Sequence, residues 1–389
     1  MNVSRMQERA VLEEYCRGLV RPDVLRLEGY VPGSAPASAG IVRISANENG
    51  FGTPPAILDA LKRYVDDGAA LNRYPDGSCR ELRRALSGKF ALPEDWFVVG
   101  NGLDDVINIL ALTYLAPGDE VVVPAMTFVV YAGAARAMGA TPVVVPMARD
   151  LSIDLDAVGG AVTERTKMVV VCNPNNPTGT VVKKGAFDRL LGALASLPRA
   201  PLFVLDQAYV DYMPAEDEDA IDVKAVLLAH GNVVALRTFS KMSGLAGLRV
   251  GYAIARPEVI SHMYRVRPPY TVNALAQLAA LVDVTDRSVQ AFKAEVSSGV
   301  AEERRKLEAF FAASGVRYVP SRANFVFAFF DRPYEDLKDL SEALEEREIL
   351  VRLLVHEAGP CGLRFSIGTP GENERLIEAL KTLLARGTK

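Results

Sequence analysis

Seven short apolar runs between residues 95 and 255 constrain the fold more than any other feature of this 389-residue sequence. Each run is rich in Val, Ile and Leu, and helical stretches separate the runs. They read WFVV, EVVVP, TPVVVP, KMVVVC, LFVLD, NVVALR and RVGYAIA. Runs that are apolar throughout are typical of strands buried on both faces. Because strands that alternate with helices form an open, mostly parallel sheet, the sequence predicts an α/β fold with helices covering both faces of the sheet.

The pattern differs on either side of this region. Residues 1–20 carry charged and apolar residues at helical spacing, and residues 29–40 are rich in Pro, Gly, Ala and Ser, which is typical of an extended arm. Helical stretches are expected over 273–313, over 334–347 and from about 371, with short apolar runs between them. The predicted units are an N-terminal helix and arm over 1–45, a large domain over 46–270 and a small α+β C-terminal domain over 271–389.

Composition excludes several classes of protein. The formal net charge is −4, so no electrostatic preference for nucleic acid or an anionic membrane is expected. The N-terminus lacks the continuous apolar core of a signal peptide, and no stretch of about 18 apolar residues occurs. Four cysteines without a CxxC pair and three histidines favour neither a disulfide framework nor a metal site. We therefore expect a cytoplasmic protein that holds no metal and lies outside the membrane.

The residues that follow each apolar run are the candidate site, because ligands of open α/β sheets bind beyond the carboxyl ends of the strands. Residues 100–105, GNGLDD, suit a strand-to-helix turn whose backbone N–H groups bind an anion, with a simple capped turn as the alternative. Residues 173–179, NPNNPTG, form a polar loop with two prolines. Asp206 ends the fifth run, where a carboxylate is costly unless it holds a cation or caps a helix.

Lys241 follows the sixth run in a segment that is otherwise apolar and rich in glycine. Such surroundings favour a lowered pKa and a role as an amine nucleophile, although a lysine in a loop is more often a solvated surface charge. Thr238, Ser240 and Arg249 lie close by in sequence and could bind a phosphate. Pyridoxal phosphate uses all these groups, because it has an aldehyde for an amine, a phosphate, and a pyridine nitrogen that a carboxylate such as Asp206 keeps protonated.

Seven motifs extend this interpretation to a known family. They are NEN at 47–49, RYPD at 73–76, GNGLDD at 100–105, CNPNNPTG at 172–179, DQAY at 206–209, TFSKMSGLAGLRVGY at 238–252 and GLRFSIGTP at 362–370. In this order and at these spacings, the chain resembles the fold-type I, class I/II aminotransferases that depend on pyridoxal phosphate, and among them most closely the histidinol-phosphate aminotransferases.

The resemblance assigns a role to individual positions. It implies that Lys241 is the Schiff-base lysine and proton shuttle, that Asp206 pairs with the pyridine nitrogen, and that Tyr209 binds the cofactor's O3′. The other cofactor-binding positions that it implies are Gly102, Leu103, Asp104, Phe128, Asn176, Thr238, Ser240, Arg249 and Tyr74. The substrate-binding positions that it implies are Tyr30, Arg352 and Arg364. Because Tyr74 would reach the cofactor of a neighbouring subunit, a homodimer with its active site at the subunit interface is expected.

The resemblance favours one reaction and leaves others open. It implies ping-pong transamination between histidinol phosphate and 2-oxoglutarate in histidine biosynthesis. An aminotransferase for aromatic or other amino acids uses the same machinery, as does a decarboxylase of the threonine-phosphate type, so both are alternatives. In each case the expected partners are small molecules, an amino donor and, for transamination, a keto-acid acceptor.

Overall fold

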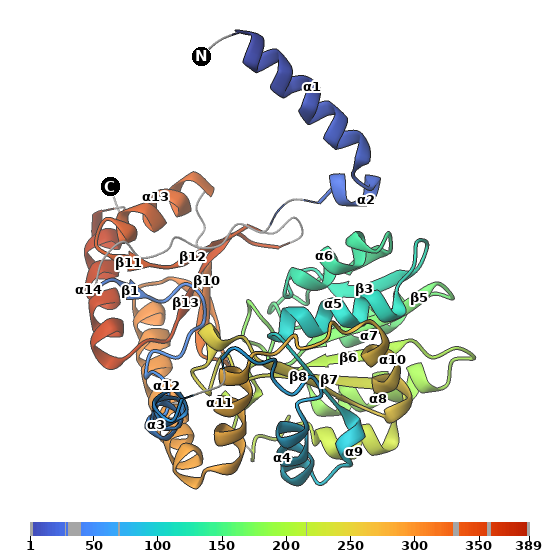
Figure 1. Cartoon of the computed structure of the whole chain (residues 1–389). Coiled ribbons are helices and arrows are strands. Elements are labelled where there is room, and N and C mark those ends of the chain that lie inside the picture. The colour runs from blue at the N-terminus through green and yellow to red at the C-terminus, as the bar shows by residue number, and fades with distance from the viewer. Residues whose placement is uncertain are drawn as a thin grey trace.

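We analysed a computed structural model of the chain, which describes residues 3–27, 29, 40–68, 71–214, 216–329, 334–355 and 359–386. The chain begins with α1 (Val3–Leu19) and α2 (Pro22–Leu25), and Figure 1 shows α1 projecting away from the body of the molecule. The helix predicted over residues 1–20 is therefore present. The predicted arm over 29–40 lies outside the described residues apart from Gly29 and Gly40.

A sheet of seven strands forms the centre of the described structure (Figure 1). Its strand order is β2-β8-β7-β6-β5-β3-β4. The strands are β2 (Phe97–Gly100), β3 (Glu120–Pro124), β4 (Thr141–Val145), β5 (Thr166–Cys172), β6 (Leu202–Asp206), β7 (Val233–Thr238) and β8 (Gly251–Ala255). β8 runs antiparallel to both its neighbours, while β3 to β7 pair in parallel. Each of the seven predicted runs forms one strand, so the mostly parallel α/β fold is confirmed.

Helices cover both faces of this sheet. Alternate residues of β6 show the division, because Phe203 and Leu205 belong to one core and Val204 belongs to the other. The first core includes residues of α3 (Pro55–Asp66), α4 (Arg80–Phe90), η1 (Glu94–Trp96), α7 (Leu155–Gly160), α8 (Lys184–Ala195), α9 (Val223–Ala229) and α11 (Ala274–Thr285). The second core includes residues of α5 (Leu103–Tyr114), α6 (Val130–Ala137) and α10 (Pro257–Val266). Burial on both faces explains why the strands are apolar at nearly every position.

A smaller α+β unit follows in the chain. Its antiparallel sheet has the order β12-β13-β10-β9, with β9 (Arg317–Val319), β10 (Phe325–Phe329), β12 (Arg352–Leu354) and β13 (Gly362–Ser366). The helices of this unit are α12 (Arg287–Ala313), α13 (Tyr334–Glu345) and α14 (Pro370–Arg386). The helical stretch predicted over 273–313 forms two helices, because the Asp286 carboxylate accepts a bond from the Ser288 N–H and starts α12 there.

Two connections join the small unit to the rest of the chain. β1 (Val42–Arg43) pairs in parallel with β11 (Ile349–Leu350), so the segment that precedes the large sheet is held on the small unit. α11 contributes Ala276 and Ala280 to the core of the large sheet, although it lies beyond residue 270. The domain limits at 45 and 270 stay a prediction. Among the described residues, none of the helices has the length and apolar character needed to cross a membrane.

Candidate active site

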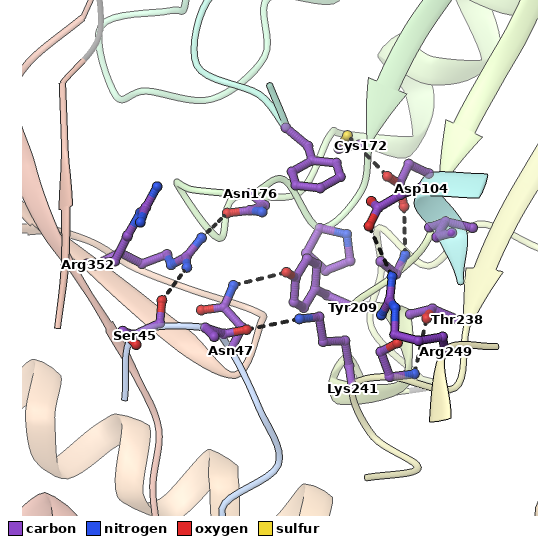
Figure 2. A pocket seen from close by; sticks show the side chains of 18 of the residues that line it. Ser45, Asn47, Asp104, Cys172, Asn176, Tyr209, Thr238, Lys241, Arg249 and Arg352 are labelled. Carbon is purple, nitrogen blue, oxygen red and sulfur yellow. Dashed lines mark hydrogen bonds and ion pairs between the residues drawn. The ribbon is translucent and has the colours of Figure 1, made fainter. Parts of the chain in front are cut away.

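A cavity of about 390 Å³ lies at the carboxyl ends of β5, β6 and β7, facing the small unit. Figure 2 shows side chains from both parts of the molecule converging on it. It is lined by Arg43, Ser45, Ala46, Asn47, Leu103, Asp104, Phe128, Cys172, Pro174, Asn176, Asp206, Ala208, Tyr209, Thr238, Ser240, Lys241, Arg249, Arg352 and Arg364. Most of these residues follow the carboxyl end of a strand, where ligands of open α/β sheets bind.

Lys241 lies in the loop after β7 and points into the cavity (Figure 2). Its Nζ donates a hydrogen bond to the Ala46 carbonyl oxygen at 3.0 Å and lies 5.8 Å from the centre of the Tyr209 ring. Burial and, to a smaller extent, the positive charge of Arg364 lower the pKa of Lys241 to about 8. About a tenth of the Lys241 amine is therefore neutral at pH 7, far more than for an ordinary lysine, and the neutral amine is the form that acts as nucleophile and general base.

Asp206 ends β6 and is 4% exposed. Its Oδ1 accepts a hydrogen bond from the Ala208 N–H at 2.9 Å, and its Oδ2 accepts bonds from the Tyr131 hydroxyl at 2.7 Å and the Cys172 thiol at 3.7 Å. Burial raises the pKa of Asp206, and the bond from Tyr131 opposes that rise. Neutral donors thus hold this carboxylate at the cavity wall, and a bound cation would stabilise its charged form.

Tyr131 has no role predicted from the sequence, although it lies three positions after the predicted Phe128. The two rings pack edge to face, with centroids 6.3 Å apart. Since β3 and β6 are separated in the sheet by β5, only the tertiary structure brings the Tyr131 hydroxyl to Asp206. Tyr131 is a positioning residue, because it acts on the reacting centre through Asp206.

We expect Tyr131→Phe to lower kcat/KM about tenfold, since it removes one hydrogen bond to a buried charged group. The acidic limb of the pH profile should move as well, because the Asp206 carboxylate loses a donor that favours its ionised form. Tyr114→Phe is the matched control, since its hydroxyl bonds the Val259 carbonyl oxygen away from the cavity. Equal effects of the two substitutions would show that the Tyr131 hydroxyl only stabilises the fold.

Tyr209 and Asn176 also line the cavity. The Tyr209 hydroxyl accepts a hydrogen bond from Asn47 Nδ2 at 2.9 Å, and burial raises the pKa of Tyr209 to about 12. Asn176 Oδ1 accepts a bond from Arg364 Nη1 at 2.6 Å. Asn47 belongs to the NEN motif but had no predicted site role; its contact with Tyr209 joins segments far apart in the sequence.

The amino end of α5 forms an anion-binding cup. Gly102 precedes the helix with φ +83°, a conformation that favours glycine, and a Cβ at this position would also lie 2.5 Å from Arg249 Nη2 and displace the guanidinium. Arg249 Nη2 donates to Asp104 Oδ2 at 3.1 Å (Figure 2). The Thr238 and Ser240 hydroxyls lie on the same cavity wall. A helix amino end, two hydroxyls and a guanidinium fit a phosphate group.

Arg364 and Arg352 come from neighbouring strands of the small sheet. The two residues are direct partners in the β12–β13 register. Arg364 is 9% exposed, and its Nη2 donates to the Ser45 carbonyl oxygen at 2.7 Å. Both side chains line the cavity on the side away from Arg249. Arginines from both parts of the molecule therefore line the cavity together with Lys241 and Asp206: Arg249 from the loop after β7, and Arg352 and Arg364 from the small sheet.

Among the predicted residues that the structure describes, Tyr74 does not line this cavity within one chain. Tyr74 is 81% exposed and stacks on Tyr270 with ring centroids 4.6 Å apart. Tyr30 lies outside the described residues. No group of three or more His, Cys, Asp or Glu side chains that could hold a metal ion occurs within the described ranges.

Cavity residues that the sequence did not single out are Arg43, Ser45, Ala46, Asn47, Cys172, Pro174 and Ala208. Cys172 is the partner of Asp206 in the β5–β6 register, which places the two side chains at the same end of adjacent strands. The order of the strands would have identified it. Arg43 carries no such signal, because the pairing of β1 with β11 depends on the tertiary structure.

Comparison with known proteins defines the class. The family of class I and II aminotransferases matches residues 39–380, and the chain belongs to this family. Among its curated relatives is the histidinol-phosphate aminotransferase of Moorella thermoacetica, which is 39% identical over 372 residues, covering 94% of this chain and 93% of the relative. The histidinol-phosphate aminotransferase of Symbiobacterium thermophilum is also 39% identical, over 95% of this chain and 99% of the relative.

Solved structures show the same similarity. The histidinol-phosphate aminotransferase of Sinorhizobium meliloti, in complex with pyridoxal 5′-phosphate, superposes with a TM-score of 0.83 at 26% identity, covering 95% of this chain and 98% of that one. A tetra mutant of the Thermus thermophilus aspartate aminotransferase superposes with a TM-score of 0.79 at 25% identity, covering 94% and 99% of the two chains. Aminotransferases named for different substrates therefore share this fold.

Proposed function

We propose that this chain is a pyridoxal-phosphate-dependent aminotransferase that takes its amino group from histidinol phosphate and passes it to 2-oxoglutarate. The observation that carries the proposal is that Lys241 and Asp206 line one cavity together with arginines from both the large sheet and the small sheet. The names of the relatives from Moorella and Symbiobacterium support the choice of substrate.

The residues of the cavity fit the cofactor group by group. The cup at α5, with Thr238, Ser240 and Arg249, would bind its phosphate, and the Lys241 amine would bind its aldehyde carbon. Asp206 would pair with its pyridine nitrogen. Asn176 and Tyr209 would bind its O3′, and Phe128 would lie against its ring. When bound, pyridoxal phosphate stabilises the electron pair that remains after the substrate loses its α-proton.

Individual side chains supply the proton transfers and the orientation of the reacting groups. Lys241 Nζ, with its pKa lowered to about 8, takes the α-proton from the amino donor and later returns it. The negative charge of Asp206 favours a protonated group opposite it and so holds the proton of the ring nitrogen in place. The hydrogen bond from Asn47 orients the Tyr209 hydroxyl toward the cavity. Because donor and acceptor use the same cavity in turn, ping-pong kinetics are expected.

The part of the cavity that Arg352 and Arg364 line suits substrates with an anionic group. A planar guanidinium binds a carboxylate or a phosphate through two parallel hydrogen bonds. Arg364 and Arg352 are the candidates for this contact, and the resemblance to the family places the same role on Tyr30. Histidinol phosphate carries a phosphate and no carboxylate, whereas glutamate carries two carboxylates, so one arginine pair would serve both half-reactions.

We also propose a homodimer whose subunits complete each other's sites. Tyr74 and Tyr270 form an exposed aromatic pair, with exposed fractions of 81% and 47%. A second subunit that covers this pair would bury apolar surface and bring the Tyr74 hydroxyl to its own cofactor phosphate. A cytoplasmic location stays a prediction from the sequence.

A panel of amino donors tests the substrate. The purified enzyme, loaded with pyridoxal phosphate, is mixed with histidinol phosphate, glutamate, phenylalanine or threonine phosphate, and the spectral change of the bound cofactor is followed for each. We expect saturable turnover of histidinol phosphate with 2-oxoglutarate, with one glutamate formed per turnover. Preferred turnover of phenylalanine would indicate an aromatic aminotransferase, and release of CO₂ from threonine phosphate would indicate a decarboxylase; either result would overturn the proposed substrate.

A further inference from the structure

Arg43 is a cavity residue to which neither the sequence motifs nor the cofactor-binding groups assign a role. We propose that Arg43 is a specificity residue. It leaves its ion pair with the Glu48 carboxylate and binds the phosphate group of the amino donor. This inference rests on the proposed function, because it names the group that recognises the phosphorylated substrate.

The backbone places Arg43 beside the other arginines of the small unit. Arg43 is the register partner of Leu350 in the β1–β11 pair, and β12 begins two residues later at Arg352. Arg352 in turn is the register partner of Arg364. Arg43, Arg352 and Arg364 therefore come from β1, β12 and β13, and all three line the cavity.

The burial pattern fixes the direction of the Arg43 side chain. Val42 is 2% exposed and Ile44 is 1% exposed, and both belong to the core of the small unit. Since successive residues of an extended segment point to opposite sides, Arg43 points away from that core and toward the cavity. Its side chain is 49% exposed, so it can change its rotamer without breaking the packing of the core.

The ion pair between Arg43 and Glu48 is weak. Arg43 Nη2 lies 3.2 Å from Glu48 Oε1, in a single contact between side chains that are 49% and 34% exposed. Ion pairs with this exposure contribute little to stability, so separating the pair costs little. Glu48 is close enough to the reacting centre that its charge raises the pKa of Lys241. Arg43 thus has a carboxylate partner beside the cavity that a stronger anion can replace.

A phosphate monoester is the stronger anion. It carries close to two negative charges at neutral pH and three acceptor oxygens, whereas Glu48 offers one charge and two oxygens. Arg364 already donates Nη1 to Asn176 and Nη2 to the Ser45 carbonyl oxygen, so its orientation is fixed by the protein. A dianion at this end of the cavity therefore gains from a further guanidinium that is free to move toward it.

The test compares histidinol phosphate with histidinol, which differs only in lacking the phosphate. In Arg43→Gln, we expect the preference for histidinol phosphate, taken as the ratio of kcat/KM values, to fall about tenfold. The kcat/KM for histidinol should stay within about twofold of the wild-type value. Arg43→Lys keeps the positive charge and should recover part of the preference. Arg347→Gln is the matched control, because Arg347 bonds the Ala343 carbonyl oxygen at the end of α13 and should leave the ratio unchanged.

The Glu48→Gln substitution tests whether Arg43 leaves Glu48 to bind the phosphate or whether the ion pair only stabilises the fold. Removing the competing carboxylate frees Arg43, so the dissociation constant of histidinol phosphate should fall two- to threefold, about the value of one exposed ion pair. In the Arg43→Gln background the same substitution should have no further effect. If both single substitutions weaken binding of the two donors equally, the pair only supports the fold and the inference is wrong.

The proposed function and the proposed role of Arg43 are tested by different measurements. Absence of histidinol phosphate turnover by the wild-type enzyme would overturn the proposed function. Turnover by the wild type together with an unchanged preference in Arg43→Gln would overturn only the role of Arg43. Thermal unfolding of each variant shows whether a change in preference occurs in a folded protein.

Discussion

Replacing Lys241 by Ala is expected to lower kcat by at least about 10⁴-fold, the largest effect of any single substitution in this chain. The substitution removes the amine that would bind the cofactor's aldehyde carbon and move the α-proton. No other lysine lines the cavity among the residues that the structure describes. Borohydride reduction followed by peptide mass spectrometry measures the first role directly: the wild-type peptide that contains Lys241 should carry the mass of the cofactor, and the variant peptide should not.

Lys184→Ala is the matched control for this experiment. Lys184 is a half-exposed lysine on α8 that pairs with Asp188 at 2.6 Å, far from the cavity lining. Its removal should leave both kcat and the labelled peptide unchanged, because exposed ion pairs contribute little. Full activity of Lys241→Ala, or cofactor mass on a different peptide, would contradict the assignment of the amine.

The second large effect is expected for Asp206→Asn, with a fall in kcat/KM of about a thousandfold. Asparagine keeps the size of the side chain and can still accept the hydrogen bond from Tyr131, so the cavity wall should persist. It lacks the negative charge that holds a proton on the ring nitrogen opposite. Loss of one partner of a buried ion pair costs about 3–5 kcal/mol, which corresponds to this change in rate.

Steady-state kinetics and the spectrum of the bound cofactor test this expectation together. Asp206→Glu restores the charge at a longer reach and should recover part of the rate. Asp188→Asn, the other half of the surface pair on α8, should have no effect. If Asp206→Asn retained the wild-type rate, the buried carboxylate would serve only the fold, and the proposed role of its negative charge would be wrong.

The strands were predictable because burial acts on every residue of each run. β3 is buried at all five positions, and a segment with no exposed face must be apolar throughout. The antiparallel direction of β8 was not predictable, because its apolar run GYAIA looks the same in either direction. The loop that contains Lys241 and Arg249 returns the chain at the same edge of the sheet, where Thr238 pairs with Gly251, and β8 therefore runs antiparallel to β7.

The cofactor residues were predictable for a related reason. Cys172 and Asp206 end adjacent parallel strands, and Lys241 follows the next one, so strand order alone brings these positions to one edge of the sheet. Residues held by contacts between distant segments were not predictable. Tyr131 reaches Asp206 from the helix after β3, and Asn47 reaches Tyr209 from a segment held on the small unit.

The sequence by itself determined the seven strands and singled out Lys241 and Asp206 as the proposed reacting groups, because apolar periodicity and the ends of strands are local properties of the chain. Only the tertiary structure decided which side chains surround them. The pairing of β1 with β11 places Arg43 in the cavity, and the antiparallel register of β12 and β13 places Arg352 beside Arg364. The β1–β11 contact joins residues hundreds of positions apart. The free energy of both contacts depends on distance in space, which the spacing along a single sequence does not contain.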